Sequence, residues 1–268
     1  MNDSENIHDF KPITYILYFC PVYHPNDAIK IRSAALIEAL HRDYGIKLDA
    51  EPRPNLPDCV FVSDLAYAFR KGNFPAFEAL LLRCGAQFHP TEAPLELVFD
   101  YSIKPRDLLP YLRALLKRRP VLPRLDPNVS FGRDKSASAL HAAVKCRNGL
   151  MMTDPDPKVV RLLINGFGAD PFIRDRVGNT MSEKMTGILL MNERKNFDSD
   201  AAYAAWRERV TETRRILQGA EDRVLMVLMG THARLGSDSP IRLIDPGFLV
   251  GRHAFRPNPN DADYNDLV

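Results

Sequence analysis

His141 and Cys146 are the two residues of this sequence that come nearest to a nucleophilic pair. An imidazole can act as a general base for a thiol when the two side chains lie within hydrogen-bonding reach. Five positions separate them, so on one helix they fall on different faces. Because no base is positioned for Cys146, we predict that it is a packed, reduced cysteine and that the chain has no catalytic residue.

A basic run could bind phosphate or an acidic partner. It consists of Lys117, Arg118 and Arg119, with Arg124 nearby. Positive side chains are also favoured at the C-terminal end of a helix, where the helix dipole is negative. No aromatic residues are interleaved with the run, as they are in surfaces that bind single-stranded nucleic acids. We therefore favour a solvated helix end, and we keep these four residues as candidate contacts with a protein partner.

Asp154 and Asp156 could suggest a metal site. A helix N-cap followed by proline at the first helical position explains the sequence of residues 154–157 more simply. Both aspartates are kept as candidate partner contacts. Three further candidate ligands, His232, Asp238 and His253, do not have the spacing of a metal site. The four cysteines do not have it either: Cys20, Cys59, Cys84 and Cys146. We expect neither a metal nor a cofactor.

The composition narrows the class of protein. A chain of 268 residues with 45% hydrophobic and 26% charged side chains can bury a core, which argues against wholesale disorder. A formal net charge of +2 does not demand nucleic acid or an anionic membrane as a partner. The most apolar N-terminal run, residues 13–23, is about half as long as a membrane span and follows acidic residues rather than basic ones. We expect an intracellular protein, cytoplasmic or nuclear.

The residues around His141 are arranged as two short helices separated by turns. Residues 138–143 include small side chains that let a neighbouring helix approach closely. Residues 157–163 carry Val and Leu on one face at helical spacing. Gly168 can take the left-handed conformation that ends a helix, and residues 175–178 suit a tight turn.

This order resembles the ankyrin repeat: a T-P-L-H-x-A-like helix, a second helix with V-x-x-L-L, a G-A-D-P turn and a D-x-x-G-N-T loop. The departures are Ser138 and Ala139 for Thr-Pro, a longer loop at 147–156, and Met181 where proline is usual. The resemblance implies that the histidine hydrogen-bonds to the backbone near the turns and stiffens the stack. It assigns structural roles in the repeat to five residues: Leu140, His141, Gly168, Asp170 and Gly178.

The same pattern recurs upstream with more departures. Residues 59–90 resemble a second ankyrin unit that lacks the histidine and turns at Gly85. Residues 94–99 and 108–116 can form a long repeat between the two clear ones, with an enlarged turn at 118–130. A degenerate first repeat is indicated by four apolar residues before Gly45: Ala35, Leu36, Ala39 and Leu40.

Beyond residue 181 the pattern loosens. Residues 200–217 predict an amphipathic helix with Trp206, Val210, Thr213 and Leu217 on its buried face. The apolar residues 224–229 predict a buried helix against the last repeat. Residues 239–249 resemble the L-P-x-E-L-L start of an F-box, although Gly247 replaces a helix-forming residue. We favour a capping segment there, and an F-box-like segment stays as the alternative.

We predict an all-α fold, an ankyrin-repeat solenoid of about four to five helix pairs with a helical C-terminal cap. Residues 1–218 would form the array, clearest at 59–90 and 137–180; residues 219–250 would form the cap, and residues 251–268 a disordered tail. The resemblance implies a scaffold or adaptor that holds another protein on its concave face and loop tips. The alternatives are an enzyme with a pocket in a remodelled array, and a ubiquitin-ligase substrate adaptor.

Overall fold

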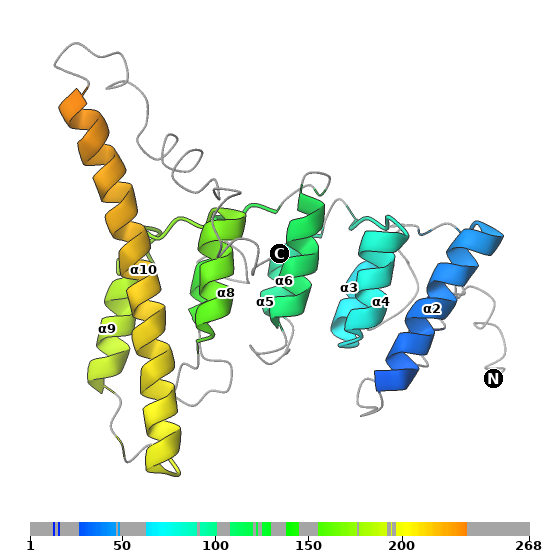
Figure 1. Cartoon of the computed structure of the whole chain (residues 1–268), viewed down its shortest axis with the longest axis horizontal. Coiled ribbons are helices and arrows are strands. Elements are labelled where there is room, and N and C mark those ends of the chain that lie inside the picture. Colours follow the sequence, from blue (N-terminus) through cyan, green and yellow to red (C-terminus); the bar gives the residue numbers. More distant parts are fainter. Residues whose placement is uncertain are drawn as a thin grey trace, which may run out of the picture. The chain divides into compact units, whose positions relative to one another are not determined.

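The structure is a computed structural model of the chain. The residues that it describes are 13, 16, 27–46, 48, 63–89, 92–100, 108–119, 122, 125–129, 138–144, 155–175, 177–191, 194 and 197–234. Within these ranges the regular structure is helical throughout and no strand is formed (Figure 1). The prediction of an all-α fold is therefore confirmed for the described part of the chain.

The chain divides into two compact units. Unit 1 comprises Met1–Ile103 and Pro110–Leu125, and unit 2 comprises Lys104–Leu109 and Asp126–Val268. Helix α6 (Leu108–Arg118) begins in unit 2 and continues into unit 1. The predicted division into an array, a cap and a tail stays a prediction.

Unit 1 combines the long helix α2 (Asp27–Tyr44) with several short helices that contact one another through aromatic rings. Its other helices are α3 (Asp64–Arg70), α4 (Phe74–Glu78), η1 (Ala79–Arg83), a π-helical turn that continues α4, and α5 (Pro94–Asp100). Helix α2 packs against α4 and η1, and α3 packs against α4 and α5. The ring of Tyr111 lies edge-on to Phe69 and Phe77, with ring centroids 4.8 and 5.0 Å apart. Such edge-to-face pairs add specificity to the burial of the rings.

The buried face of α2 differs from the one indicated by the sequence. Ala35 and Leu36 are exposed, whereas Ala34 and Ile37 are buried. Apolar residues surround this part of the helix on several sides, so their spacing alone does not select a face. The packing partners α4 and η1 select it instead.

Three second helices of the predicted repeats end in the same way. The N–H groups of Ile46, Ala86 and Ala169 donate to the carbonyl oxygen six residues earlier, at 3.5, 2.8 and 2.9 Å. The residue before each of these is a glycine with positive φ: Gly45 (60°), Gly85 (70°) and Gly168 (74°). Glycine is favoured there because a side chain would be strained at this φ.

Unit 2 contains α7 (Ala139–Val144), α8 (Pro157–Leu162), η4 (Leu163–Phe167), α9 (Met181–Met191) and α10 (Asp200–Arg234). Helix α10 packs against α8 and α9. Its buried face repeats at helical spacing and includes every residue that the sequence analysis placed on that face: Trp206, Val210, Thr213 and Leu217, followed by Ala220 and Val224.

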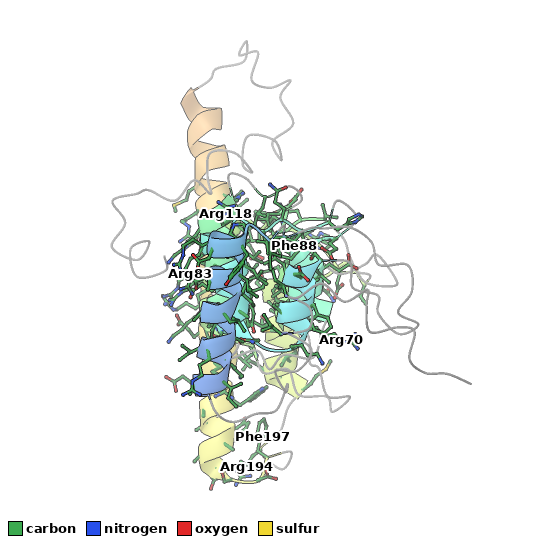
Figure 2. All side chains as sticks on the ribbon, turned by 90° about the vertical axis from the view of Figure 1, so that its right-hand side faces the viewer. Arg70, Arg83, Phe88, Arg118, Arg194 and Phe197 are labelled. Atoms are coloured by element: carbon green, nitrogen blue, oxygen red, sulfur yellow. The ribbon has the colours of Figure 1, made fainter. Side chains whose placement is uncertain are left out.

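The start of α10 is held by its own capping groups. The Ser199 hydroxyl accepts from the N–H of Ala202 at 3.1 Å, as an N-cap does. Arg194, which Figure 2 shows beside Phe197, pairs with Asp200 and donates to the carbonyl of Phe197 at 2.9 Å. The Phe197 ring packs on Trp206 with centroids 5.0 Å apart. These contacts place the Phe197 ring against the buried face of α10.

Helix α10 continues without a break from residue 218, where the array was predicted to end, to residue 219, where the cap was predicted to begin. The prediction that residues 224–229 are buried is right for Val224 and wrong for Leu225 and Met226, which are exposed. The cause is the helical period, which turns the two residues after Val224 away from α8 and α9. The F-box-like segment 239–249 and the predicted tail lie outside the described residues.

Replacement of Leu217 by alanine tests the packing of α10. The side chain is fully buried, so Leu217→Ala should lower the free energy of unfolding of unit 2 by about 2–5 kcal/mol. The neighbouring control Gln218→Ala, on the exposed face, should change it by less than about 0.5 kcal/mol. Urea unfolding followed by the fluorescence of Trp206, the single tryptophan, measures both. Equal effects of the two substitutions would contradict this packing.

Candidate functional site

His141 lies on α7 with its ring buried at 6% exposure. The Ser138 hydroxyl lies 2.8 Å from Nδ1, and the Ser138 N–H donates to the same atom at 3.4 Å. An Nδ1 that accepts from an N–H carries no proton, so in the neutral ring the proton is on Nε2. Nε2 is buried and has no hydrogen-bond partner in the structure. Ser138 therefore performs the orienting role at the start of this helix.

The environment of His141 favours the neutral ring. Burial lowers the pKa of His141 below its ordinary value of 6.5, and the positive charge of Lys184 lowers it further, against a smaller opposite effect of Asp175. A charged ring in this place would lose hydration without gaining a hydrogen bond at Nε2. Cys146, with which a catalytic pair was considered, lies outside the described residues.

Cys84 is the free thiol that the structure describes, and it is half-buried. Burial raises the pKa of its thiol, and the nearby Glu38 raises it further, against a smaller opposite effect of Arg83. A thiol with a raised pKa is mostly protonated at neutral pH and is a poor nucleophile. This agrees with a packed, reduced cysteine.

Asp156 caps α8, as its sequence context indicates. Its carboxylate accepts from the N–H of Lys158 at 2.9 Å, and Pro157 occupies the first helical turn. The N-cap interpretation is therefore confirmed for Asp156. Asp154 lies outside the described residues, and no group of three potential metal ligands occurs among the residues that the structure describes.

Asn128 is a structural residue that sequence reasoning missed. Its side-chain oxygen accepts from the N–H of Asp170 at 2.7 Å, and its amide nitrogen donates to the carbonyl of Gly168 at 3.3 Å. Its own N–H donates to Asp126 at 2.9 Å. Asn128 thus fastens one turn to the turn that ends η4. The signal in the sequence was Asp-Pro-Asn, a typical turn sequence, inside a segment treated only as an enlarged loop.

The turn after Asp170 is held by Asp175. Its carboxylate accepts from the N–H groups of Val177 and Asn179 at 2.9 and 3.1 Å and pairs with Lys184 at 3.3 Å. Burial raises the pKa of Asp175, but these hydrogen bonds and Lys184 together lower it below the ordinary value. Gly178 has φ of 91°, so the predicted tight turn at residues 175–178 is confirmed.

Helix α9 begins without the proline that is usual after this turn. The N–H of Thr180 donates to the carboxylate of Glu183 at 2.7 Å, and the N–H of Glu183 lies 3.4 Å from the Thr180 hydroxyl. This reciprocal pair is a capping box, which satisfies two helix-end donors. It starts the helix at Met181, so the missing proline is compensated.

The structure separates the three described members of the basic run. Lys117 and Arg119 are exposed, whereas Arg118 is half-buried, with one guanidinium nitrogen 3.7 Å from the point where a Cβ of Gly85 would lie. Arg124 lies outside the described residues. The basic run and Asp156 belong to different units, so each is a candidate contact by itself.

The comparisons with known proteins agree with the geometry around His141. Residues 137–176 match the family model described as Ankyrin repeat. This span covers α7, α8, η4 and most of the turn built on Asp175. The chain therefore contains an ankyrin repeat there. No curated protein and no solved structure matches the chain. None of the described helices has the length and apolar character needed to cross a membrane.

The pH dependence of unit 2 tests the environment of His141. Because the pKa of His141 is lowered in the folded protein, the unfolded chain binds the proton more readily. Stability should therefore be complete above the unfolded-state pKa of about 6.5 and fall as the pH drops below it. His141→Gln should remove this part of the pH dependence and cost about 1–3 kcal/mol at pH 8. His41→Gln in unit 1 is the control. A pH profile of Trp206-detected unfolding that is unchanged in His141→Gln would contradict the assignment.

A second prediction concerns the turn held by Asn128. Asn128→Ala leaves the N–H of Asp170 without its acceptor, so we expect unit 2 to lose about 1–3 kcal/mol of unfolding free energy. Val129→Ala, at an exposed neighbouring position, should cost less than about 0.5 kcal/mol. Hydrogen exchange of the Asp170 amide, measured by NMR, should be faster only in the first variant. Unchanged exchange in Asn128→Ala would show that this bond does not hold the turn.

Proposed function

We propose that this chain is a protein-binding scaffold or adaptor, with the first helices of its repeats and the tips of its turns as the contact surface. An ankyrin repeat suggests protein binding in general, and residues 137–176 form one. The finer proposal rests on two features of the structure: the recurrence of one helix ending, and apolar side chains exposed on turns and helices with fixed backbones.

The recurrent helix ending supports an array of repeats. Gly45, Gly85 and Gly168 close three helices with the same hydrogen bond, 40 and 83 residues apart. The second interval is about twice the first, and α5 and α6 lie within it. A repeat of about forty residues accounts for both intervals if α5 and α6 form the intervening unit. Repeats of this kind bury their apolar faces only against neighbours, so several are needed for stability.

Val177 carries the proposal for the contact surface. It is 81% exposed, yet its backbone is held by the Asp175 carboxylate in the turn that precedes α9. At the other end of α9, Leu190 and Met191 are 80% and 82% exposed. Exposed apolar side chains on an ordered backbone lose little conformational entropy on binding and gain from burial. These positions match the turn tip and the first helix of a repeat, which are the surfaces proposed for the partner.

Surface substitutions test this proposal. The full chain and the double variant Val177→Asp, Leu190→Asp are immobilised, and the proteins that each retains from host-cell extract are quantified by mass spectrometry. We expect at least one partner to be lost by about tenfold or more in the double variant, because charges would be buried in the interface. Gln218→Glu, which adds one negative charge on the exposed face of α10, should retain it. Unchanged retention in the double variant would refute this contact surface, provided that its Trp206-detected unfolding matches wild type.

A further inference from the structure

Two arginines flank the turn at Gly85 in unit 1, and they differ in their partners. Arg83 pairs with Glu38 at 2.7 Å and lies 4.0 Å from Glu78. Arg118 comes from the last turn of α6, and its guanidinium lies over Gly85. In Figure 2, Arg83 and Arg118 lie toward the same end of α2, and Arg70 lies toward the other end. The charge of Arg83 is thus neutralised by carboxylates of the chain itself.

Arg118 is not neutralised in this way. Its Nε atom is buried without a hydrogen-bond partner, and no ion pair reaches its guanidinium from the described residues. The Arg118 side chain is half-buried, whereas Arg83, which pairs with Glu38, is 51% exposed. A cation that has lost part of its hydration without gaining a carboxylate is costly. The carbonyl groups at the end of α6 offset only part of this cost, since they carry about half a negative charge.

The neighbours of Arg118 add positive charge. Lys117 and Arg119 are exposed on either side of it in the sequence. The whole chain carries a net charge of only +2, so this run of three basic residues is not the consequence of a generally basic protein. A half-buried guanidinium with exposed cations beside it suits a ligand whose carboxylate can accept two parallel N–H bonds.

We infer that the end of α6, formed by Lys117, Arg118 and Arg119 above Gly85, binds a carboxylate-rich peptide segment of a partner protein. This inference rests on the proposed protein-binding function and names the chemistry of the partner. An acidic peptide fits better than nucleic acid, because only one guanidinium of the site, that of Arg118, is partly removed from water. A polyanion with regular phosphates would require an extended row of cations, which the net charge of the chain does not support.

A defined probe tests the inference without knowledge of the natural partner. A fluorescein-labelled peptide of eight glutamates is titrated with the full chain, and binding is followed by fluorescence anisotropy at low and moderate salt. Wild type should bind it, and binding should weaken as salt screens the charges. Arg118→Gln should weaken binding by about 10- to 100-fold, the range expected for a lost charge-assisted hydrogen bond. Arg118→Lys, which keeps the charge and loses the fork, should fall between the two.

Matched controls separate this site from general charge and from misfolding. Arg207→Gln removes one exposed positive charge from α10 and should change the affinity by less than about twofold. Lys117 is exposed, so its replacement should not disturb folding. Lys117→Gln should weaken binding by about threefold. Urea unfolding followed by circular dichroism confirms that each variant is folded. An Arg118→Gln variant that binds like wild type would overturn the inference, and so would equal losses in Arg118→Gln and Arg207→Gln.

An oligonucleotide decides the class of ligand. A labelled eight-nucleotide thymidine strand should bind at least about tenfold more weakly than the glutamate peptide. Equal or tighter binding would overturn the assignment to an acidic peptide. The outcome is separable from that of the contact-surface test, because Val177 and Leu190 lie in unit 2 and Arg118 in unit 1. Loss of a partner in the unit 2 variant with no effect of Arg118 would defeat this inference alone.

Discussion

The burial of apolar faces between neighbouring helices is the constraint on which the described structure depends. Helices α3, α5, α7 and α8 have six or seven residues each, and helices of that length are not stable alone in water. Each therefore requires a neighbour that covers its apolar side. In unit 2 the long helix α10 does this for α8 and α9. In unit 1 the rings of Phe69, Phe77 and Tyr111 join α3, α4 and α6.

Polar side chains fix the backbone at the ends of these packed helices and in the turns between them. The ends of short helices expose a large share of their N–H and C=O groups, so each end needs a partner. Ser63, Asn73 and Asp156 accept from such N–H groups, and glycines with positive φ close three of the helices. Asn128 and Asp175 do the same for the turns. The turn surface is therefore ordered before any partner binds, which lowers the entropic cost of binding.

Two of the buried polar atoms without a hydrogen-bond partner in the described residues, Nε2 of His141 and Nε of Arg118, differ in what they imply. Nε2 of His141 is buried in the ankyrin repeat, where the neutral ring leaves one donor unpaired and burial disfavours the charged ring further. Arg118 instead places a guanidinium in a half-buried position where its Nε has no hydrogen-bond partner. A group of the first kind is compatible with a structural role alone. A group of the second kind is stabilised by a nearby anion, which is why Arg118 is the basis of our inference about a ligand.

The local structure of this protein, its helices, caps and turns, could be predicted from the sequence. Which face of a helix is buried could not always be predicted. Residue patterns predicted the Asp156 cap, the turn at Gly178 and the buried stripe of α10, because each depends on residues within one or two helical turns. The resemblance to the ankyrin repeat predicted the all-α class and a repeat at 137–180, where the family model matches residues 137–176. The capping box at Thr180 and the role of Asn128 were missed. Only the tertiary structure decided four other features. They are the buried face of α2, the exposure of Leu225 and Met226, the contact of Asn128 with Asp170, and the position of Arg118 over Gly85. Each of these joins segments distant in sequence or depends on which neighbour covers a helix, and local propensity contains no information about either.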